Sequence, residues 1–437
     1  MILVYCDHIT ERHRFIFDFI FGDILGTGCK LTQNREEFLA CKAEKISYSP
    51  ENLPDGLHFQ PHGLLNKKGI VDQNIKISKW NSLPVFFQVG DRSALPFDPF
   101  SLSFYLISRY EEYLPFQPDE HNRFRPELSL AYREGFLQVP LVDAIAHEMK
   151  TLLKAEFPGI SIPGQAFRFI PSFDIDIAFA HLGKGLPRAS AAWLKLLLKA
   201  DLRQIKERIS TMSGKMTDPY DNFQLHKDLA AKYGHHLLYF ALLADFGRYD
   251  RNTSYRSKKF RNLLSKLSLT AEMGLHPSYR SYLNPELFVK ETRRLGEIIR
   301  KPIINNRFHF LRLKFPESYQ ILVNEGIKND FSLGYSSLNG FRASTCTPFY
   351  FYDLVKEERT DLRIHPFIFM DSAMIDHLKI TPEAAVEEIK NLVNQVKMYG
   401  GEAIGIWHNY SLGEKDQYTG WSEVLTSILE LYQTTKK

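Results

Sequence analysis

The chain has 437 residues, which is long for one ordinary hydrophobic core, so we expect two domains. Its 55 Lys and Arg residues nearly balance its 51 Asp and Glu residues, and a net charge of +4 argues against nucleic-acid binding, which usually needs a concentrated basic surface. Four cysteines without metal-type spacing argue against a disulfide framework and favour a reducing compartment.

The N-terminal sequence MILVYCDHITERHRFIFDFIF starts with a strand-like run, which charged residues then interrupt. A signal peptide would show a continuous apolar region there, and no part of the chain reaches the roughly 18 apolar residues of a membrane span. We therefore expect a cytoplasmic protein without a membrane-spanning segment.

The first 160 residues combine short strand-like runs with proline-rich connections, and they predict a smaller α+β domain. A helix is predicted over residues 100–113, where Arg109 and Glu112 are three residues apart and can pair across one turn. The stretch FPGISIPGQAF at 157–167 consists mainly of turn-forming residues. We place the domain boundary there, which divides the chain into residues 1–160 and 161–437.

After this boundary, short apolar runs alternate with helical patterns, which is typical of βα units around a parallel sheet or barrel. The clearest strand candidates are Phe169–Phe173, Leu237–Leu243, Met273–Leu275, Pro302–Ile304, Ile364–Met370 and Ala403–Trp407. A helix is predicted at 381–399, with Thr381 as its N-cap. The basic stretch 184–215 has a Leu and Ile stripe, which we expect to pack on its own domain rather than on a membrane.

Polar side chains with metal-binding or acid–base chemistry follow five of the predicted strands. In a βα fold the carboxyl ends of the strands lie at one face, where the loops converge. The residues at these ends are Asp174, Asp176, His276, Arg307, His309, Asp371 and His408. Each one alone is more often a turn former or a structural residue, but their convergence favours a functional site.

The chemistry of these side chains suits a divalent metal ion. Asp and His are ligands for zinc, and a catalytic zinc site uses about three of them and leaves one position for water. Neighbours in an extended strand alternate between faces, so Asp174 and Asp176 point the same way. One of them could bind the metal while the other accepts a proton from water, and a histidine facing them could protonate a leaving group.

The motifs SFDID, EMGLHPSYRS and WHN occur in this order along the chain. With them, the region from about 168 to 437 resembles the polysaccharide deacetylase (NodB-homology) superfamily, as a divergent member. The resemblance implies a distorted (β/α) barrel that hydrolyses N-acetyl groups on sugars. The first 160 residues resemble an uncharacterised domain that sometimes precedes such deacetylases.

The resemblance also implies roles for the residues of these motifs. Asp174 would be the general base, and Asp176 and His276 would be metal ligands. His408 would be the general acid. Arg307, in the segment NRFHFLR, would orient the base.

One metal ligand is missing from its usual place. The family's second motif carries another histidine four residues after the first, where this chain has Arg280. We expect His309 to supply the missing ligand, because its loop follows another strand end.

Four further residues are candidates for contact with the substrate. We expect Arg312, Asp371 and Tyr279 to orient it. Arg342, in the segment GFRAST, could contact a substrate hydroxyl or acid group, and a structural salt bridge is the alternative.

These expectations predict a metal-dependent N-deacetylase of an amino-sugar-containing glycan or glycan precursor, with zinc as the expected ion and a carbohydrate as its partner. Two alternatives stay open. One is a non-catalytic carbohydrate-binding protein on the same fold, which the missing second histidine favours. The other is a hydrolase of a different non-peptide C–N bond, such as that of a cyclic ureide or a formamide.

Overall fold

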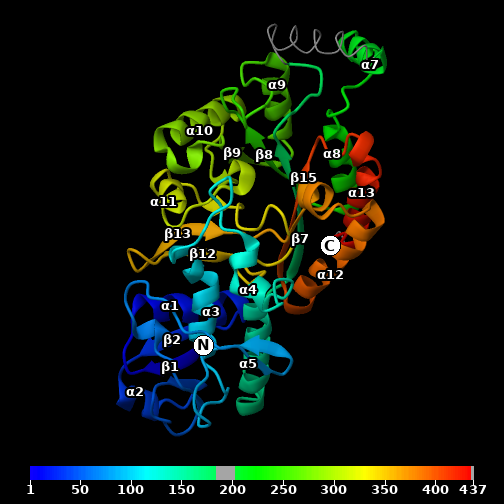
Figure 1. The fold of residues 1–437 in the computed structure, drawn as a ribbon. Helices are drawn as coiled ribbons and strands as arrows, with labels where there is room; N and C mark the ends of the chain where they lie inside the picture. The colour runs from blue at the N-terminus through cyan, green and yellow to red at the C-terminus, as the bar shows by residue number, and fades with distance from the viewer. Residues whose placement is uncertain (184–201, 435–437) are drawn as a thin grey trace.

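A computed structural model describes residues 1–183 and 202–434 of the protein. The fold is mixed α/β, with a four-stranded sheet in the N-terminal region and a nine-stranded sheet in the remainder. Figure 1 shows the N-terminal region in blue below the larger sheet and its helices, which run from green to red. Among the described residues, no helix combines the length and the apolar character that crossing a membrane requires.

The N-terminal sheet has the strand order β2-β1-β3-β4, and all of its neighbouring strands run parallel. Its strands are β1 (Ile2–Cys6), β2 (Cys29–Thr32), β3 (Lys45–Tyr48) and β4 (Leu57–Phe59). Parallel neighbours need crossover connections, which α1 (Glu11–Phe17) and α2 (Arg35–Ala40) provide. The sheet therefore has an α/β arrangement. We expected an α+β arrangement here, and the parallel pairing of the strands differs from it.

Two further strands, which pair antiparallel, and three α-helices complete this region. They comprise β5 (Ser78–Trp80), β6 (Leu83–Val85), α3 (Pro99–Ile107), α4 (Leu130–Arg133) and α5 (Leu141–Glu156). The predicted helix at 100–113 ends early, because Ser108 is followed by Arg109 with a left-handed φ of 53°. The predicted pair is confirmed, since Arg109 Nε lies 2.8 Å from Glu112 Oε1.

The larger sheet has the order β12-β13-β11-β10-β9-β8-β7-β15-β14 and is parallel except between β12 and β13. Its strands are β7 (Phe167–Ile175), β8 (Leu238–Leu242), β9 (Glu272–His276), β10 (Asn305–Asn306), β11 (Asn329–Asp330), β12 (Phe349–Asp353), β13 (Glu358–Ile364), β14 (Phe369–Met370) and β15 (Gly401–His408). Sequential parallel strands joined by helices confirm the α/β character that the alternating patterns predicted.

The described α-helices of this region precede, connect or follow these strands in the chain. They are α7 (Leu202–Met212), α8 (Phe223–Tyr233), α9 (Lys258–Leu267), α10 (Pro285–Ile299), α11 (Glu317–Asn324), α12 (Pro382–Tyr399) and α13 (Trp421–Leu431). In Figure 1, α12 and α13 lie on the right beside β7 and β15, and α10 and α11 lie on the left. The predicted N-cap is confirmed, because the Thr381 side chain accepts from the amide of Ala384. Residues 184–201 of the predicted amphipathic stretch lie outside the described residues.

The predicted strand at Ile364–Met370 is wrong as a single element. β13 ends at Ile364 and β14 begins at Phe369 on the other side of the sheet order. Pro366 lies between them and has no N–H to donate to a strand ladder, so the chain can leave one strand pair and join another. The strand predicted at 302–304 is likewise displaced, to β10.

The segment before β14, at one end of the parallel run, approaches the segment after β11, the strand next to β13 at the other end. The amide of Phe367, just before β14, donates to the carbonyl of Leu333, just after β11, over 3.1 Å. Strand pairing among the described residues does not extend this contact into a ladder. A distorted closed barrel therefore stays a prediction.

Candidate metal centre

The parallel sheet brings the residues predicted from the strand ends to one place. Asp174 and Asp176 lie at the end of β7, His276 ends β9, Arg307 and His309 follow β10, Asp371 follows β14, and His408 ends β15. Parallel strands all point their carboxyl ends to the same edge, so these side chains converge although they come from distant parts of the sequence.

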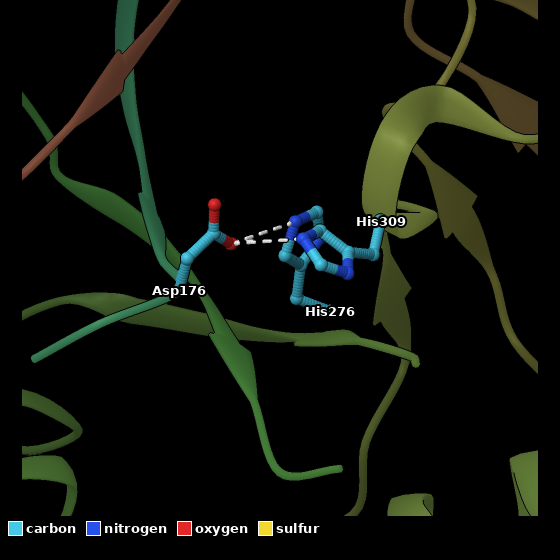
Figure 2. A group of neighbouring side chains, drawn as sticks. All are labelled: Asp176, His276 and His309. Carbon is cyan, nitrogen blue, oxygen red and sulfur yellow. Dashed lines mark ion pairs between the residues drawn. The ribbon is translucent and has the colours of Figure 1, made fainter. Parts of the chain in front are cut away.

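Three of them can hold one metal ion. Asp176, His276 and His309 offer ligand atoms that all lie within 4.8 Å of one another. Nε2 of His276 is 3.2 Å from Oδ1 of Asp176, and Nε2 of His309 is 3.8 Å from the same oxygen (Figure 2). Asp176 Oδ1 is buried and has no hydrogen-bond partner among the described residues. A buried carboxylate oxygen without a partner is costly, and a cation between it and the two imidazoles would satisfy it.

The two imidazole rings are oriented by contacts on their far side. His276 Nδ1 lies 2.5 Å from the carbonyl oxygen of Arg307, and His309 Nδ1 lies 3.0 Å from Oδ1 of Asp250. Both partners are acceptors, so each Nδ1 carries the hydrogen and each Nε2 keeps its lone pair toward Asp176. This arrangement is the one that metal-binding histidines adopt. Arg280, at the position where the resemblance led us to look for a second histidine, is exposed.

The electrostatics of the cluster favour an ionised carboxylate. Burial alone would raise the pKa of Asp176, but His309, His276 and His408 hold it well below its usual range. Burial alone would lower the pKa of His276, but Asp174 and Asp176 together raise it. The cluster therefore attracts positive charge, and a metal ion and a proton would compete for His276.

Asp174 is held beside this cluster by a buried arginine. Its Oδ1 accepts from Arg307 Nη1 over 2.8 Å, and its Oδ2 lies 3.8 Å from Nε2 of His276. Arg307 also donates from Nη2 to Ser172 Oγ over 2.8 Å and from Nε to the carbonyl of Phe331 over 3.0 Å. Arg307 is thus held in place and contacts only Oδ1 of Asp174, which leaves Oδ2 on the side of His276.

His408 lies beside the same carboxylates, as the cross-strand partner of Asp174. Its Nδ1 lies 2.6 Å from Asp371 Oδ1, and its Nε2 lies 3.7 Å from Asp176 Oδ2. Burial alone would lower the pKa of His408, but Asp371 and Asp176 raise it to about 10. The imidazole therefore carries a proton at neutral pH, with Nε2 as the atom that can release it.

A cavity of about 550 Å³ opens on this group and includes Asp176 and His309 in its wall. This volume is within the range of small-molecule sites. Its aromatic wall consists of His121, Tyr220, Tyr249, Phe310, Tyr410 and Tyr418. Flat aromatic faces beside a polar centre are suited to a ligand that has both apolar and hydrogen-bonding surfaces.

The remaining predicted substrate contacts occupy different positions. Tyr279 lies next to the cavity, stacked on Tyr249 with ring centroids 4.1 Å apart. Arg312 is buried against Tyr279, with its guanidinium 3.9 Å from the ring centroid. Arg342 is buried in a bidentate pair with Glu112, at 2.9 Å and 2.5 Å. This pair is the structural salt bridge that we considered as the alternative to a substrate contact.

Sequence reasoning missed three residues of the site. Asp250 supports His309, but it lies eight residues after the end of β8, too far along its loop for the strand-end rule. Tyr410 follows His408 by two residues, and that spacing could have signalled a shared direction. His121 comes from the N-terminal region, and nothing in the sequence connects it with residues after 160.

Comparison with known proteins covers the two regions unequally. Residues 2–158 match the model of a family of unknown function (DUF7033). No curated protein matches the chain. Among solved structures, one that resembles it is a protein from Mycobacterium smegmatis, proposed to be a polysaccharide deacetylase. It is 14% identical with a TM-score of 0.39, over 62% of this chain and 86% of that chain, and so weak a likeness carries no argument.

Proposed function

We propose that this protein is a metal-dependent hydrolase that removes N-acetyl groups from an amino-sugar-containing glycan or glycan precursor. The observation that carries the proposal is the buried, unpartnered Oδ1 of Asp176, which faces the Nε2 atoms of His276 and His309. The donor set of one carboxylate and two imidazoles fits a catalytic zinc site, with positions left for water and substrate.

In this proposal Asp176, His276 and His309 hold a divalent ion, with zinc as the first candidate. Such an ion, when bound, supplies a Lewis acid that makes water nucleophilic near neutral pH and polarises an acyl oxygen. The contacts of both Nδ1 atoms support the assignment, because they keep the two Nε2 lone pairs available.

The chain's own residues supply the proton transfers. Asp174 accepts the proton of the attacking water at its free carboxylate oxygen, and Arg307 keeps that carboxylate oriented. His408 Nε2 donates a proton to the departing amine of the sugar, and Asp371 holds the ring for this task. The different partners of the two groups support this division of roles, because Asp174 is paired with Arg307 whereas His408 is paired with Asp371.

The substrate would lie in the cavity beside these residues. The aromatic wall can stack on the faces of a sugar ring, while Asp176 and His309 at its base are next to the acyl group. We further propose that residues 161–437 form a distorted (β/α) barrel and residues 1–160 a separate domain. The Phe367–Leu333 backbone contact supports closure of the barrel.

Two measurements on the full-length protein test this function. The first is the stoichiometry of bound zinc, cobalt and nickel after dialysis, for the native sequence, for Asp176→Ala, and for Asp361→Ala as an exposed carboxylate control. We expect one metal per chain, lost only in Asp176→Ala. The second is acetate release from N-acetylated chitooligosaccharides, with the same pattern of loss.

Absence of metal binding in the native protein would contradict the metal centre. Metal binding without acetate release from any N-acetylated sugar would contradict the deacetylase and favour hydrolysis of a different C–N bond.

A further inference from the structure

The loop that carries His309 has an unusual backbone. Phe310 and Leu311, which follow the proposed metal ligand, have φ values of 58° and 53°. Residues with a side chain rarely adopt this left-handed conformation, and two in succession persist only where surrounding contacts hold them. The position of His309 therefore depends on whatever holds the residues beside it.

Those residues are held by a segment of the N-terminal region. Arg123 Nη1 donates to the carbonyl oxygen of Phe310 over 2.8 Å. The carbonyl oxygen of His121 accepts from Arg312 Nε over 2.8 Å. The two bonds attach to the chain one and three residues after His309, so they act on both ends of the left-handed turn.

The segment is itself firmly organised. Asp119 accepts from the backbone amides of His121 and Arg123, both over 2.8 Å, and its Oδ2 accepts from Arg123 Nε over 2.7 Å. The Arg123 guanidinium is thereby aimed at the carbonyl oxygen of Phe310. A preorganised donor of this kind loses little entropy on making its contact.

Side-chain contacts join the same segment to the cavity wall. His121 Nδ1 lies 3.0 Å from the hydroxyl of Tyr279, and its ring meets Phe310 edge to face with centroids 5.0 Å apart. In Figure 1 the cyan part of the chain rises from the N-terminal region to the strands of the larger sheet. The N-terminal region therefore supplies part of the wall next to the candidate metal centre.

We propose that residues 119–123 position His309 for metal binding, so that the metal centre depends on the N-terminal region. Arg123 is the principal positioning residue, because its side chain bonds both to Asp119 and to the carbonyl oxygen of Phe310, the residue directly after His309. The inference rests on the proposed metal centre and assigns to the DUF7033-matching region a task in that centre. It predicts that substitutions outside the ligand set change metal affinity through His309.

The test is zinc affinity of the full-length protein, measured by competition with a chromophoric chelator. We expect Arg123→Ala to weaken zinc binding about 10-fold or more, the usual effect of losing a group that orients a ligand. Arg133→Ala, an exposed arginine of the same region, is the matched control and should bind zinc as the native protein does. The cobalt-loaded Arg123→Ala protein should also show an altered visible spectrum, because the spectrum reports ligand geometry.

A double substitution separates positioning from general damage. In a His309→Ala background, Arg123→Ala should lower zinc affinity no further, since its effect passes through that side chain. An equal loss in both backgrounds, or native affinity in Arg123→Ala, would overturn the inference. Asp119→Asn, which loosens Arg123 without removing it, repeats the test if Arg123→Ala folds poorly. A native protein that binds no zinc would instead contradict the proposed function.

Discussion

Asp371 and His408 come from neighbouring strands and are joined at two points. Asp371 Oδ1 lies 2.6 Å from His408 Nδ1, and Asp371 Oδ2 accepts from the backbone amide of His408 over 2.6 Å. The hydroxyl of Ser411 also donates to this carboxylate. The ring is thus fixed in one orientation and tautomer, with Nε2 toward Asp176.

Asp371→Asn should therefore reduce turnover without removing the metal. An amide at this position has no negative charge to stabilise the imidazolium, so the pKa of His408 falls and less of the ring is in the form that donates a proton from Nε2. We expect kcat for acetate release to fall about 100-fold, within the usual range for a general acid, with KM nearly unchanged. Zinc stoichiometry is the control and should stay at the native value, because Asp371 touches no proposed ligand atom. Native turnover in this variant would remove His408 from the proton-donor role.

The buried pair of Arg307 and Asp174 gives a prediction about stability. Arg307→Met removes the cation and leaves a buried carboxylate without its partner, which typically costs about 3–5 kcal/mol in the free energy of unfolding. Urea denaturation of the metal-free protein measures this change in the free energy of unfolding. Ser172→Ala removes a neutral contact of the same guanidinium and the bond from Ser172 Oγ to the carbonyl oxygen of Gly405, and it should cost less, about 2 kcal/mol.

Adding Asp174→Asn to Arg307→Met distinguishes a charge effect from a packing effect. The amide needs no cation, so the double variant should recover part of the lost free energy. No recovery would mean that packing of the arginine, and not its charge, stabilises this end of the sheet.

The convergence of the site could be predicted because it follows from one rule. Residues placed directly after buried strands of a parallel sheet share an edge, and this rule located Asp174, Asp176, His276 and His408 without three-dimensional information. It succeeded at strand ends that long apolar runs mark clearly.

Contacts made by loops and between regions followed no such rule. Asp250 lies well inside a loop whose path depends on packing. His121 belongs to the N-terminal region and contacts the site only through the tertiary structure. β10 was displaced because two residues of ladder carry almost no periodic signal. The local sequence pattern thus predicts which residues lie at the carboxyl edge of the parallel sheet. The residues that orient those side chains depend on tertiary packing.

A buried histidine away from the metal centre predicts how stability depends on pH. His226, on α8, stacks on Phe173 with ring centroids 4.1 Å apart and lies 3.2 Å from the Tyr239 hydroxyl through Nδ1. Its Nε2 has no hydrogen-bond partner among the described residues. Burial lowers its pKa from 6.5 to about 3. Between these values the unfolded chain binds a proton that the native protein does not, so the free energy of unfolding falls as pH falls below 6.5.

At pH 5 this histidine should cost the native protein about 2 kcal/mol relative to pH 7.5, since each pKa unit corresponds to about 1.4 kcal/mol. His226→Gln removes the titrating group. Between pH 7.5 and pH 5, the free energy of unfolding of this variant should therefore fall by about 2 kcal/mol less than that of the native protein. Urea denaturation at both values measures it, and His236→Gln, an exposed histidine nearby in sequence, should behave as the native protein does. Equal losses in the native protein and His226→Gln would mean that the ring reaches a proton in the folded state. In that case the aromatic packing around α8 must open to water below pH 6.5.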